Sequence, residues 1–329
     1  MKLISQSAQY LPQQTGIDGI YKQIELAGRT SYLSWDKMTD DSAKKFVDML
    51  IKSKHTSVLE HGTVYLKMYS PGIFEKIQPH NVYDYLHNPY CKYKEFVTPD
   101  GLQKFAMTYY ITTNLRVLQE NGWLDDLKYL CEPTEFHEKR LSVKVVTSRS
   151  ISHELVRHRS MSFIQESQRY VGYDNRFGEI TYIKPLWLGY NVPCGTVYYH
   201  DGINYRIMPD ENKPEDFISV RPGNDFTEEE ALRLTNFFRV LDNAEYYYKR
   251  LKKDGLKSQE AREVLPNATK TELVITAFES DWREWFAQRL FGKTGQPHPD
   301  MLVLANLIKE EFEKAGVWEG IMKYPSKYE

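Results

Sequence analysis

Apolar residues recur at helical spacing near the start of the 329-residue chain. Residues 17–29 show this spacing, with a glycine close to their end. In residues 40–54, Phe46, Met49 and Leu50 form one apolar stripe after an aspartate suited to cap a helix. Both stretches are therefore predicted to be amphipathic helices that bury one face.

Strand patterns occur in two other stretches. In residues 63–70, Val64, Leu66 and Met68 alternate with polar residues, which is the period of a half-buried strand. Residues 141–148 predict a second strand. The chain thus mixes the two kinds of element.

The rest of the pattern divides into helices and irregular segments. Residues 71–99 are rich in Pro, Asn, His and Tyr and are predicted to be loops. Residues 184–226 predict strand-like pieces with a hairpin at 195–208. Thr227, with acidic residues in the turn after it, predicts a capped helix start. Helices are predicted over 105–123, 151–158, 227–255, 269–290 and 299–316.

These elements predict a mixed α/β (α+β) fold. No repeat, low-complexity tract or flexible linker divides the chain, so residues 1–329 are expected to form a single domain. A chain of this length can bury an ample core. The segments at about 71–140 and 184–226 are interpreted as insertions in that domain.

The charge balance restricts the class of partner. Lysine and arginine number 43 and the acidic residues 45, which gives a formal net charge of −2 and argues against nucleic acid or an anionic membrane as partner. No run approaches the roughly 18 apolar residues of a membrane span, and the N-terminus lacks an apolar signal segment. Three separated cysteines, Cys91, Cys131 and Cys194, favour a reducing environment over a disulfide framework. We therefore expect a cytoplasmic protein with small ligands.

Polar chemistry concentrates in residues 157–170, which read RHRSMSFIQESQRY. The arginines offer planar forks that pair bidentately with a phosphate or an imide-like edge, which lysine cannot copy. Ser167 and Arg169 are suited to hold a phosphate, and Gln165 adds an amide donor and acceptor. The alternative is a solvated helix end whose cations are favoured by the helix dipole. Because guanidinium and amide side chains outnumber those of lysine and glutamate in this segment, we favour a site for a small anion.

Other catalytic patterns fail on their spacing. His153 and His158 lie roughly 140° apart around a helix, so they cannot share a metal ion on one face, and no metal is expected. The Gly-Lys-Thr at 292–294 lacks the opening glycine of a phosphate-binding loop, because Ala287 stands there. No GxGxxG occurs, and no neighbour clearly activates a cysteine as a nucleophile.

Three segments together resemble the flavin-dependent thymidylate synthases. Residues 157–159 (RHR), followed after seven residues by Ser167, match the RHR-x7-S signature of that family, and the QRY at 168–170 continues it. Residues 55–61 (HTSVLEH) are similar to its N-terminal block and residues 261–266 (AREVLP) to its C-terminal one. The resemblance covers residues 17–70, 141–183 and 255–316.

The resemblance implies a reaction and an architecture. Members of the family methylate deoxyuridine monophosphate (dUMP) to dTMP, with 5,10-methylenetetrahydrofolate as the carbon donor and NADPH as the reductant through bound FAD. Because the hydride travels by flavin, no cysteine nucleophile is needed. The family fold implies a curved sheet flanked by helices, and a homotetramer with active sites shared between subunits.

The resemblance also assigns residues to ligands by position. Arg289 is the expected catalytic residue at the uracil edge, where a fixed guanidinium would stabilise developing negative charge. Arg262 is expected to reach the phosphate from a neighbouring subunit, and His55 to help position folate. FAD would contact His55, Ser57, Arg157, His158, Arg159, Gln165 and Glu284. The nucleotide would contact Glu154, Arg157, Gln165, Ser167, Arg169, Arg262 and Arg289.

Several positions depart from the family pattern. Ile164 stands where asparagine is frequent, and Gln288 where leucine is expected. Phe278, Ser280 and Glu284 occupy positions where members often place asparagine, arginine, and asparagine or histidine near the flavin. These departures motivate the alternative of a nucleotide- or nucleic-acid-binding protein that has lost flavin chemistry.

Overall fold

Strands from distant parts of the chain form the framework of the molecule. The computed structural model describes residues 1–70, 82–99, 105–173, 178–200, 204–213, 215–223 and 225–328. The strands are β1 (Lys2–Ile4), β2 (Ser7–Tyr10), β3 (Thr63–Ser70), β4 (Lys92–Pro99), β5 (Phe105–Asn114), β6 (Arg140–Ser148), β7 (Ser162–Gln165), β8 (Thr181–Ile183), β9 (Gly195–His200), β10 (Asn204–Met208), β11 (Ile218–Val220) and β12 (Lys270–Phe278). The helices are α1 (Gly16–Tyr32), α2 (Ser42–Lys52), α3 (Val82–Leu86), α4 (Leu115–Asn121), α5 (Arg149–Leu155), α6 (Glu228–Lys253), α7 (Ser258–Ala261), α8 (Glu279–Arg289), α9 (Pro299–Lys314) and α10 (Trp318–Met322).

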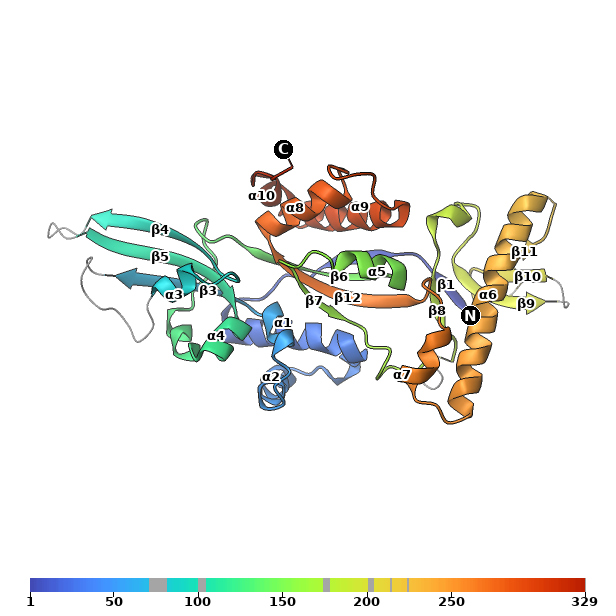
Figure 1. The fold of residues 1–329 in the computed structure, drawn as a ribbon, viewed down its shortest axis with the longest axis horizontal. Coiled ribbons are helices and arrows are strands. Elements are labelled where there is room, and N and C mark those ends of the chain that lie inside the picture. Colours follow the sequence, from blue (N-terminus) through green and yellow to red (C-terminus); the bar gives the residue numbers. More distant parts are fainter. Residues whose placement is uncertain are drawn as a thin grey trace.

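The strands are distributed over three sheets. A central four-stranded antiparallel sheet has the order β2–β6–β12–β7, which leaves β7 at one edge. The sheets β3–β5–β4 and β11–β10–β9–β1–β8 lie toward opposite ends of the long axis (Figure 1). The mixed α/β class is confirmed, with several sheets in place of the one curved sheet that the resemblance implied.

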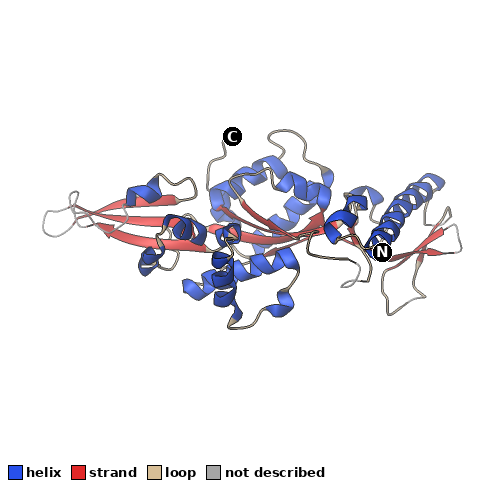
Figure 2. Ribbon diagram, turned by 60° about the horizontal axis from the view of Figure 1, so that its bottom comes forward, coloured by secondary structure: helices blue, strands red, loops and turns tan. Residues whose placement is uncertain are grey.

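Helices cover both faces of the central sheet (Figure 2). On one face α5, α8 and α9 pack against β6 and β12 through Leu155, Trp285 and Leu304. On the other face α1 packs through Ala27 against Val274. Because both faces are covered, β12 is buried throughout beyond its first residue.

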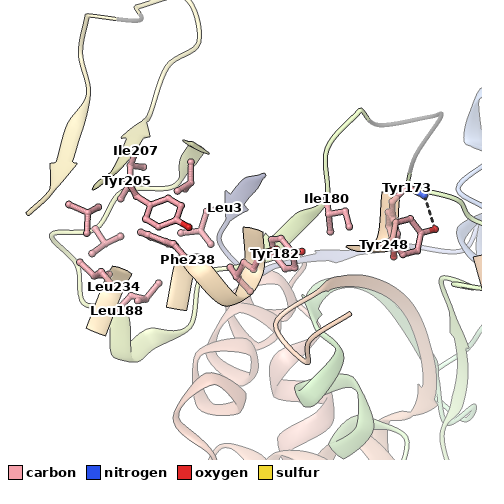
Figure 3. Close-up of a cluster of buried hydrophobic side chains, with 14 of the residues drawn as sticks. Leu3, Tyr173, Ile180, Tyr182, Leu188, Tyr205, Ile207, Leu234, Phe238 and Tyr248 are labelled. Atoms are coloured by element: carbon pink, nitrogen blue, oxygen red, sulfur yellow. Dashed lines mark hydrogen bonds between the residues drawn. The ribbon is translucent and has the colours of Figure 1, made fainter. Parts of the chain in front are cut away.

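Each end sheet has a core of its own. Helix α6 packs across the five-stranded sheet, and Figure 3 shows Leu3, Tyr205 and Phe238 within that core. Helices α1 and α2 share a second core with the three-stranded sheet. The segments 71–140 and 184–226 supply strands of these end sheets, and their status as insertions stays a prediction.

The two helices predicted from N-terminal stripes are confirmed as α1 and α2. In α2, Phe46 and Leu50 are buried, whereas Met49 is 46% exposed and does not belong to the stripe. The expected aspartate cap is wrong, because Asp41 occupies the N-cap position without a side-chain capping bond.

Most other elements read from periodicity are confirmed as well. The strands at 63–70 and 141–148 are β3 and β6, and the helices at 227–255 and 299–316 are α6 and α9. Thr227 forms the expected capping box at the start of α6. The hairpin is β9 paired with β10, and its turn at 201–203 lies outside the described residues. The helix predicted over 151–158 is α5, which ends at Leu155.

Two predicted helices are strand–helix units instead. Residues 105–123 form β5 and then α4, and residues 269–290 form β12 and then α8. The β-branched and aromatic residues of β5 favour a strand. In β12, burial on both faces removes the alternation that marks a half-buried strand. A short continuous apolar run is therefore ambiguous by periodicity alone.

The loop expected over residues 71–99 is also corrected. Residues 71–81 lie outside the described residues, while residues 82–99 contain α3 and β4. Strand β4 pairs with β5 along its whole length, from Lys92 opposite Thr112 to Pro99 opposite Phe105. Pairing with β5, the next strand along the chain, makes this segment extended.

Candidate active site

The candidate site lies around β7, the edge strand of the central sheet. At the end of β7, Gln165 bonds toward the face covered by α5: its Nε2 donates to Ser152 Oγ at 2.9 Å and to Thr271 Oγ1 at 3.0 Å. Two residues later, the backbone N–H of Ser167 donates to the carbonyl of Ser31 in α1 at 2.9 Å. The segment that follows β7 therefore passes from the α5 face of the sheet to the α1 face.

On the α5 face, Arg289, Glu154 and His158 form a connected cluster. Arg289 lies in the last turn of α8 and donates from Nη1 to Glu154 Oε2 at 3.1 Å and from Nη2 to the Glu154 carbonyl at 3.2 Å. Its Nε donates to His158 Nε2 at 3.0 Å. The Arg289 and Glu154 side chains are only 19% and 28% exposed, so solvent screens their ion pair less than a surface pair. The fold thus brings together three residues that the sequence assigned to the site.

His158 is neutral within this cluster. Burial, with smaller contributions from the positive charges of Arg289 and Lys327, lowers the pKa of His158 to about 4. A guanidinium can only donate hydrogen bonds, so His158 Nε2 is the unprotonated ring nitrogen that accepts. A neutral acceptor orients Arg289 without compensating its charge.

On the α1 face a cavity of about 970 Å³ lies among α1, α2 and the 3₁₀ helix Thr56–His61. His55 and Ser57 line this cavity, as do Tyr32 and Tyr170, whose ring centroids are 5.3 Å apart. None of the described residues that line it is acidic. Its cationic side chains are Arg29, Lys37, Lys54 and Arg116. Such a lining suits a large anionic ligand that carries a planar ring.

The end of α1 contributes cavity residues that were not predicted from the sequence. Arg29 donates to Glu25 Oε1 from Nε at 3.1 Å and from Nη2 at 2.8 Å, and its guanidinium lies 4.6 Å from the centre of the Phe46 ring. Ser31 and Tyr32 follow it along the cavity wall. The run Arg-Thr-Ser-Tyr at this helix end is polar and aromatic like residues 157–170, and that composition could have marked it.

Arg116 reaches the cavity from α4 and was also missed. Its Nη1 donates a hydrogen bond to Glu60 of the 3₁₀ helix. Its Nε donates to Glu120 in its own helix at 2.8 Å. Thr56 Oγ1 donates to Glu120 at 2.7 Å. These bonds attach the cavity-lining 3₁₀ helix to α4, a contact that only the folded chain reveals.

The three arginines named by the sequence motif are exposed at this edge of the molecule. Arg157 and Arg159 lie in the turn after α5, and Arg169 lies in the turn after β7. The Arg169 backbone N–H donates to Ser167 Oγ at 3.3 Å, and its guanidinium lies 5.4 Å from the centre of the Tyr170 ring. Their exposure leaves all three accessible to a ligand.

Two other assigned residues are engaged elsewhere. Glu284 Oε1 accepts a hydrogen bond from the backbone N–H of Lys327 at 2.7 Å. Arg262 Nε lies 3.9 Å from Glu263 Oε1. Burial lowers the pKa of Arg149, and the positive charge of Arg262 adds to that shift. Within the part of the chain that the structure describes, no hydrogen bond or ion pair joins Arg262 to the Arg289 cluster.

The positions that depart from the family pattern have packing partners. Phe278 is buried with the Arg140 guanidinium 5.4 Å from its ring centre. The Ser280 backbone N–H donates to Glu138 Oε1 at 3.0 Å. Ile164 packs between α1 and the central sheet. Phe278 and Ile164 thus contribute to local structure through their side chains, and Ser280 through its backbone.

The described ranges contain neither a cluster of metal-ligating side chains nor a membrane-spanning helix. There, no three His, Cys, Asp or Glu side chains come together as a metal site would require. None of the helices in those ranges combines the length and the apolar character needed to cross a membrane.

Comparisons with known proteins find similar sequences. A family model described as thymidylate synthase complementing protein matches residues 15–125 and 119–315. A flavin-dependent thymidylate synthase of Mycobacteroides abscessus is 31% identical over 148 residues, which are 43% of this chain and 46% of that protein. The chain thus spans less than half the length of that relative.

Solved structures give only a weak likeness. Two structures of the UMP/dUMP methylase PolB from Streptomyces cacaoi, bound with 5-Br dUMP and with 5-Br UMP, align over 98% of this chain and over 97% and 96% of theirs. The TM-score is 0.43 for both, at 14% and 15% identity. A likeness at this level carries no argument about substrate.

Proposed function

The chain belongs to the thymidylate synthase complementing protein family, and from that premise we propose that it is a flavin-dependent thymidylate synthase, a methyltransferase that converts dUMP to dTMP. The carbon comes from 5,10-methylenetetrahydrofolate and the reducing equivalents from NADPH through bound FAD. The observation that carries the proposal is the cluster of Arg289, Glu154 and His158, which α5 links to the phosphate-suited segment after β7.

Arg289 has the geometry for the uracil edge. A guanidinium carries five N–H donors, and the contacts to Glu154 and His158 use three of them. Two donors therefore remain for a planar edge with a carbonyl oxygen beside a ring nitrogen. A positive charge fixed there favours the N3-deprotonated, electron-rich ring, whose C5 is the atom that must react.

The nucleotide phosphate belongs at the turn after β7. Ser167 offers a hydroxyl, and Arg169 and Arg157 offer exposed guanidiniums. Glu154 and Gln165 contact the nucleoside. Arg262 reaches the phosphate from a neighbouring subunit in a homotetramer, as the family resemblance implies.

The cavity on the α1 face fits FAD. Its volume of about 970 Å³ suits a large cofactor, and Lys37 and Lys54 in its lining suit a pyrophosphate, whereas Arg29 and Arg116 are already paired with carboxylates. His55 and Ser57 contact FAD from this wall, and Arg157, His158, Arg159 and Gln165 from the β7 edge. Glu284 is the weakest of the assigned contacts, since Lys327 already holds it. Bound FAD would supply the hydride carrier for the reaction.

The cysteines support a route that does not use a thiolate. Burial raises the pKa of Cys91 to about 11 and also raises that of Cys131. Cys194 lies against Ser5, with its Sγ 3.2 Å from the hydroxyl. Cys91 and Cys131 are thus protonated at neutral pH, which makes them poor nucleophiles.

An absorption spectrum of the purified protein tests the proposal. We expect oxidised flavin that NADPH bleaches, and faster reoxidation when dUMP and methylenetetrahydrofolate are both present. dTMP should accumulate in the same reaction. A colourless protein that does not take up added FAD, and that forms no dTMP, would refute the proposal and favour a nucleotide-binding protein without flavin chemistry.

A further inference from the structure

Glu166 is a buried carboxylate in the middle of the predicted nucleotide-binding segment. It is 2% exposed and lies between Gln165 and Ser167. Its backbone N–H donates to the carbonyl of Glu272 at 2.8 Å, which continues the β7–β12 ladder by one residue. Gln165 points toward Ser152 of α5, and Glu166, as the next residue of an extended chain, points to the opposite face.

The Glu166 carboxylate closes the loop that carries the assigned phosphate ligands. Tyr173 Oη donates to Glu166 Oε1 at 3.0 Å, so the bond joins the two ends of loop 167–172. Within this loop, Val171 N donates to the Ser167 carbonyl at 2.9 Å. The loop presents the Ser167 hydroxyl and the exposed Arg169 side chain. The conformation of this loop therefore depends on a buried carboxylate.

The other oxygen of Glu166 belongs to an ionic chain on β6 and β12, in which the carboxylates are buried and the lysines half-buried. Lys270 Nζ lies 3.1 Å from Glu166 Oε2 and 2.5 Å from Glu272 Oε1. Lys144 Nζ lies 2.8 Å from Glu272 Oε2 and 3.8 Å from the centre of the Trp35 ring. Two carboxylates and two ammonium groups alternate, so the buried charges compensate one another.

This chain attaches the loop to the sheet. Burial raises the pKa of Glu166, and the Lys270 ammonium opposes that shift. Removing one member of a buried ionic chain leaves its partners uncompensated, so the neighbouring backbone has to adjust. The backbone nearest to Glu166 is that of Ser167.

We propose that Glu166 is a positioning residue for phosphate recognition: by bonding Tyr173 and Lys270, it holds loop 167–172 so that Ser167 and Arg169 meet the phosphate of the nucleotide. This inference rests on the proposed function, and it adds a determinant of phosphate selectivity to that site. Glu166 acts through the loop and touches neither nucleotide nor flavin.

The preference for dUMP over deoxyuridine distinguishes a positioning role of Glu166 from a contribution to stability alone. The purified holoenzyme and its variants are titrated by calorimetry with dUMP and with deoxyuridine, which lacks the phosphate. Glu166→Gln removes the negative charge beside Lys270 and leaves one acceptor oxygen where the carboxylate offered two, and in Tyr173→Phe the loop-closing bond is absent. We expect both variants to lose about 10- to 100-fold in dUMP affinity, with deoxyuridine affinity within about twofold of wild type.

Glu245→Gln is the matched control. Glu245 is also a buried carboxylate with two cationic partners, Lys249 at 2.6 Å and the N-terminal amino group at 3.5 Å, in the core beside α6. We expect a lower Tm for this variant with an unchanged ratio of dUMP to deoxyuridine affinity. Should Glu166→Gln fail to fold, Tyr173→Phe decides the question.

The outcomes separate the two claims. If wild type binds dUMP and the folded variants keep its full preference for dUMP over deoxyuridine, the positioning role is refuted and the proposed function stands. A ratio that falls equally in Glu245→Gln would also refute the positioning role. If wild type binds no dUMP, the proposed function fails and the inference fails with it.

Discussion

At the scale of single residues, the site depends on how Arg289 is held. Glu154 offers a carboxylate oxygen and a carbonyl, and His158 a neutral ring nitrogen. The Glu154 carboxylate therefore partly compensates the positive charge of the guanidinium, and the neutral His158 only orients it. An arginine fixed in this way can stabilise a developing anion without having to move first.

Replacing Arg289 tests this role directly. We expect Arg289→Ala to lower the rate of methylation by roughly 100-fold or more, because it removes the fixed charge at the uracil edge. dUMP and FAD should still bind detectably through the other assigned residues. Single-turnover measurements of dTMP formation, with ligand titrations beside them, check both statements. Arg289→Lys is a useful companion, since a lysine keeps the charge without the fork. Full turnover in Arg289→Ala would exclude the assigned role.

A second residue-scale prediction concerns His61, which is 1% exposed beneath the cavity wall. Burial, helped by the positive charge of Arg140, lowers the pKa of His61 to about 3 from its ordinary value of 6.5. Between about pH 3 and pH 6.5, His61 is therefore protonated in the unfolded chain but neutral in the folded chain. The contribution of His61 to stability is complete above about pH 6.5 and is lost progressively as the pH falls toward 3.

Urea unfolding at pH 7 and pH 4.5 measures this effect. The wild-type free energy of unfolding should fall by about 2–3 kcal/mol more than that of His61→Gln over this interval. The variant loses the contact to Thr276 Oγ1, which is 2.8 Å from His61 Nδ1, and should be less stable at pH 7. His87→Gln, at an exposed histidine, should keep the wild-type pH dependence. An equal loss in wild type and His61→Gln would contradict the prediction.

At the scale of elements, the contact between α1 and α2 shows how closely the cavity wall is packed. A Cβ atom added at Gly28 would lie 2.6 Å from Phe46 Cε1 and 3.1 Å from Val58 Cγ1. Phe46 also lies beneath the Arg29 guanidinium. Phe46 of α2 leaves no room for a side chain at position 28, and this close packing explains the glycine inside α1. Helix propensity would favour alanine there.

We expect Gly28→Ala to destabilise the protein by about 1–3 kcal/mol, the usual range for overpacking a core. An exposed helix position would show the opposite sign, since alanine exceeds glycine in helix propensity by about 1 kcal/mol. Thermal unfolding of Gly28→Ala and of Lys22→Ala, an exposed change in the same helix, measures the difference. A gain of stability in Gly28→Ala would show that α2 moves freely away from α1.

Element prediction from the sequence succeeded for most elements that expose one face, and also for β6, which is buried along most of its length. Helices α1, α2, α6 and α9 and strand β3 kept their periodicity for that reason. It failed at β5 and β12, which are buried on both sides, and at β4, which is extended because β5 pairs with it. The missing information in each case was the neighbouring element, which local sequence does not specify.

At the scale of the whole molecule, the motif named candidate residues for the site but did not predict their arrangement. The pairing of Glu154 and His158 with Arg289, and the position of His55 and Ser57 on a separate wall, emerged from the fold. Arg116 was missed because its partner Glu60 is distant in sequence. Arg262 remains apart from the cluster within one chain, so the complete site requires a second subunit if the assignment is right.

Mixing two inactive variants tests that requirement. If Arg262 serves the site of a neighbouring subunit, Arg262→Ala and Arg289→Ala chains should complement each other. A site built from Arg289 of the first chain and Arg262 of the second is intact, and random assembly should restore activity to about one quarter of the sites. Co-expression with two affinity tags, tandem purification and a dTMP assay measure the recovery.

The control pairs the Arg289→Ala chain with a chain that carries both substitutions. That mixture can form the same oligomers, but none of its sites contains Arg289, so it should stay inactive. Recovery only in the first mixture would establish sites shared between subunits. If the first mixture forms mixed oligomers and remains as inactive as the control, Arg262 serves its own chain, because only a residue supplied by the neighbour can be restored by mixing.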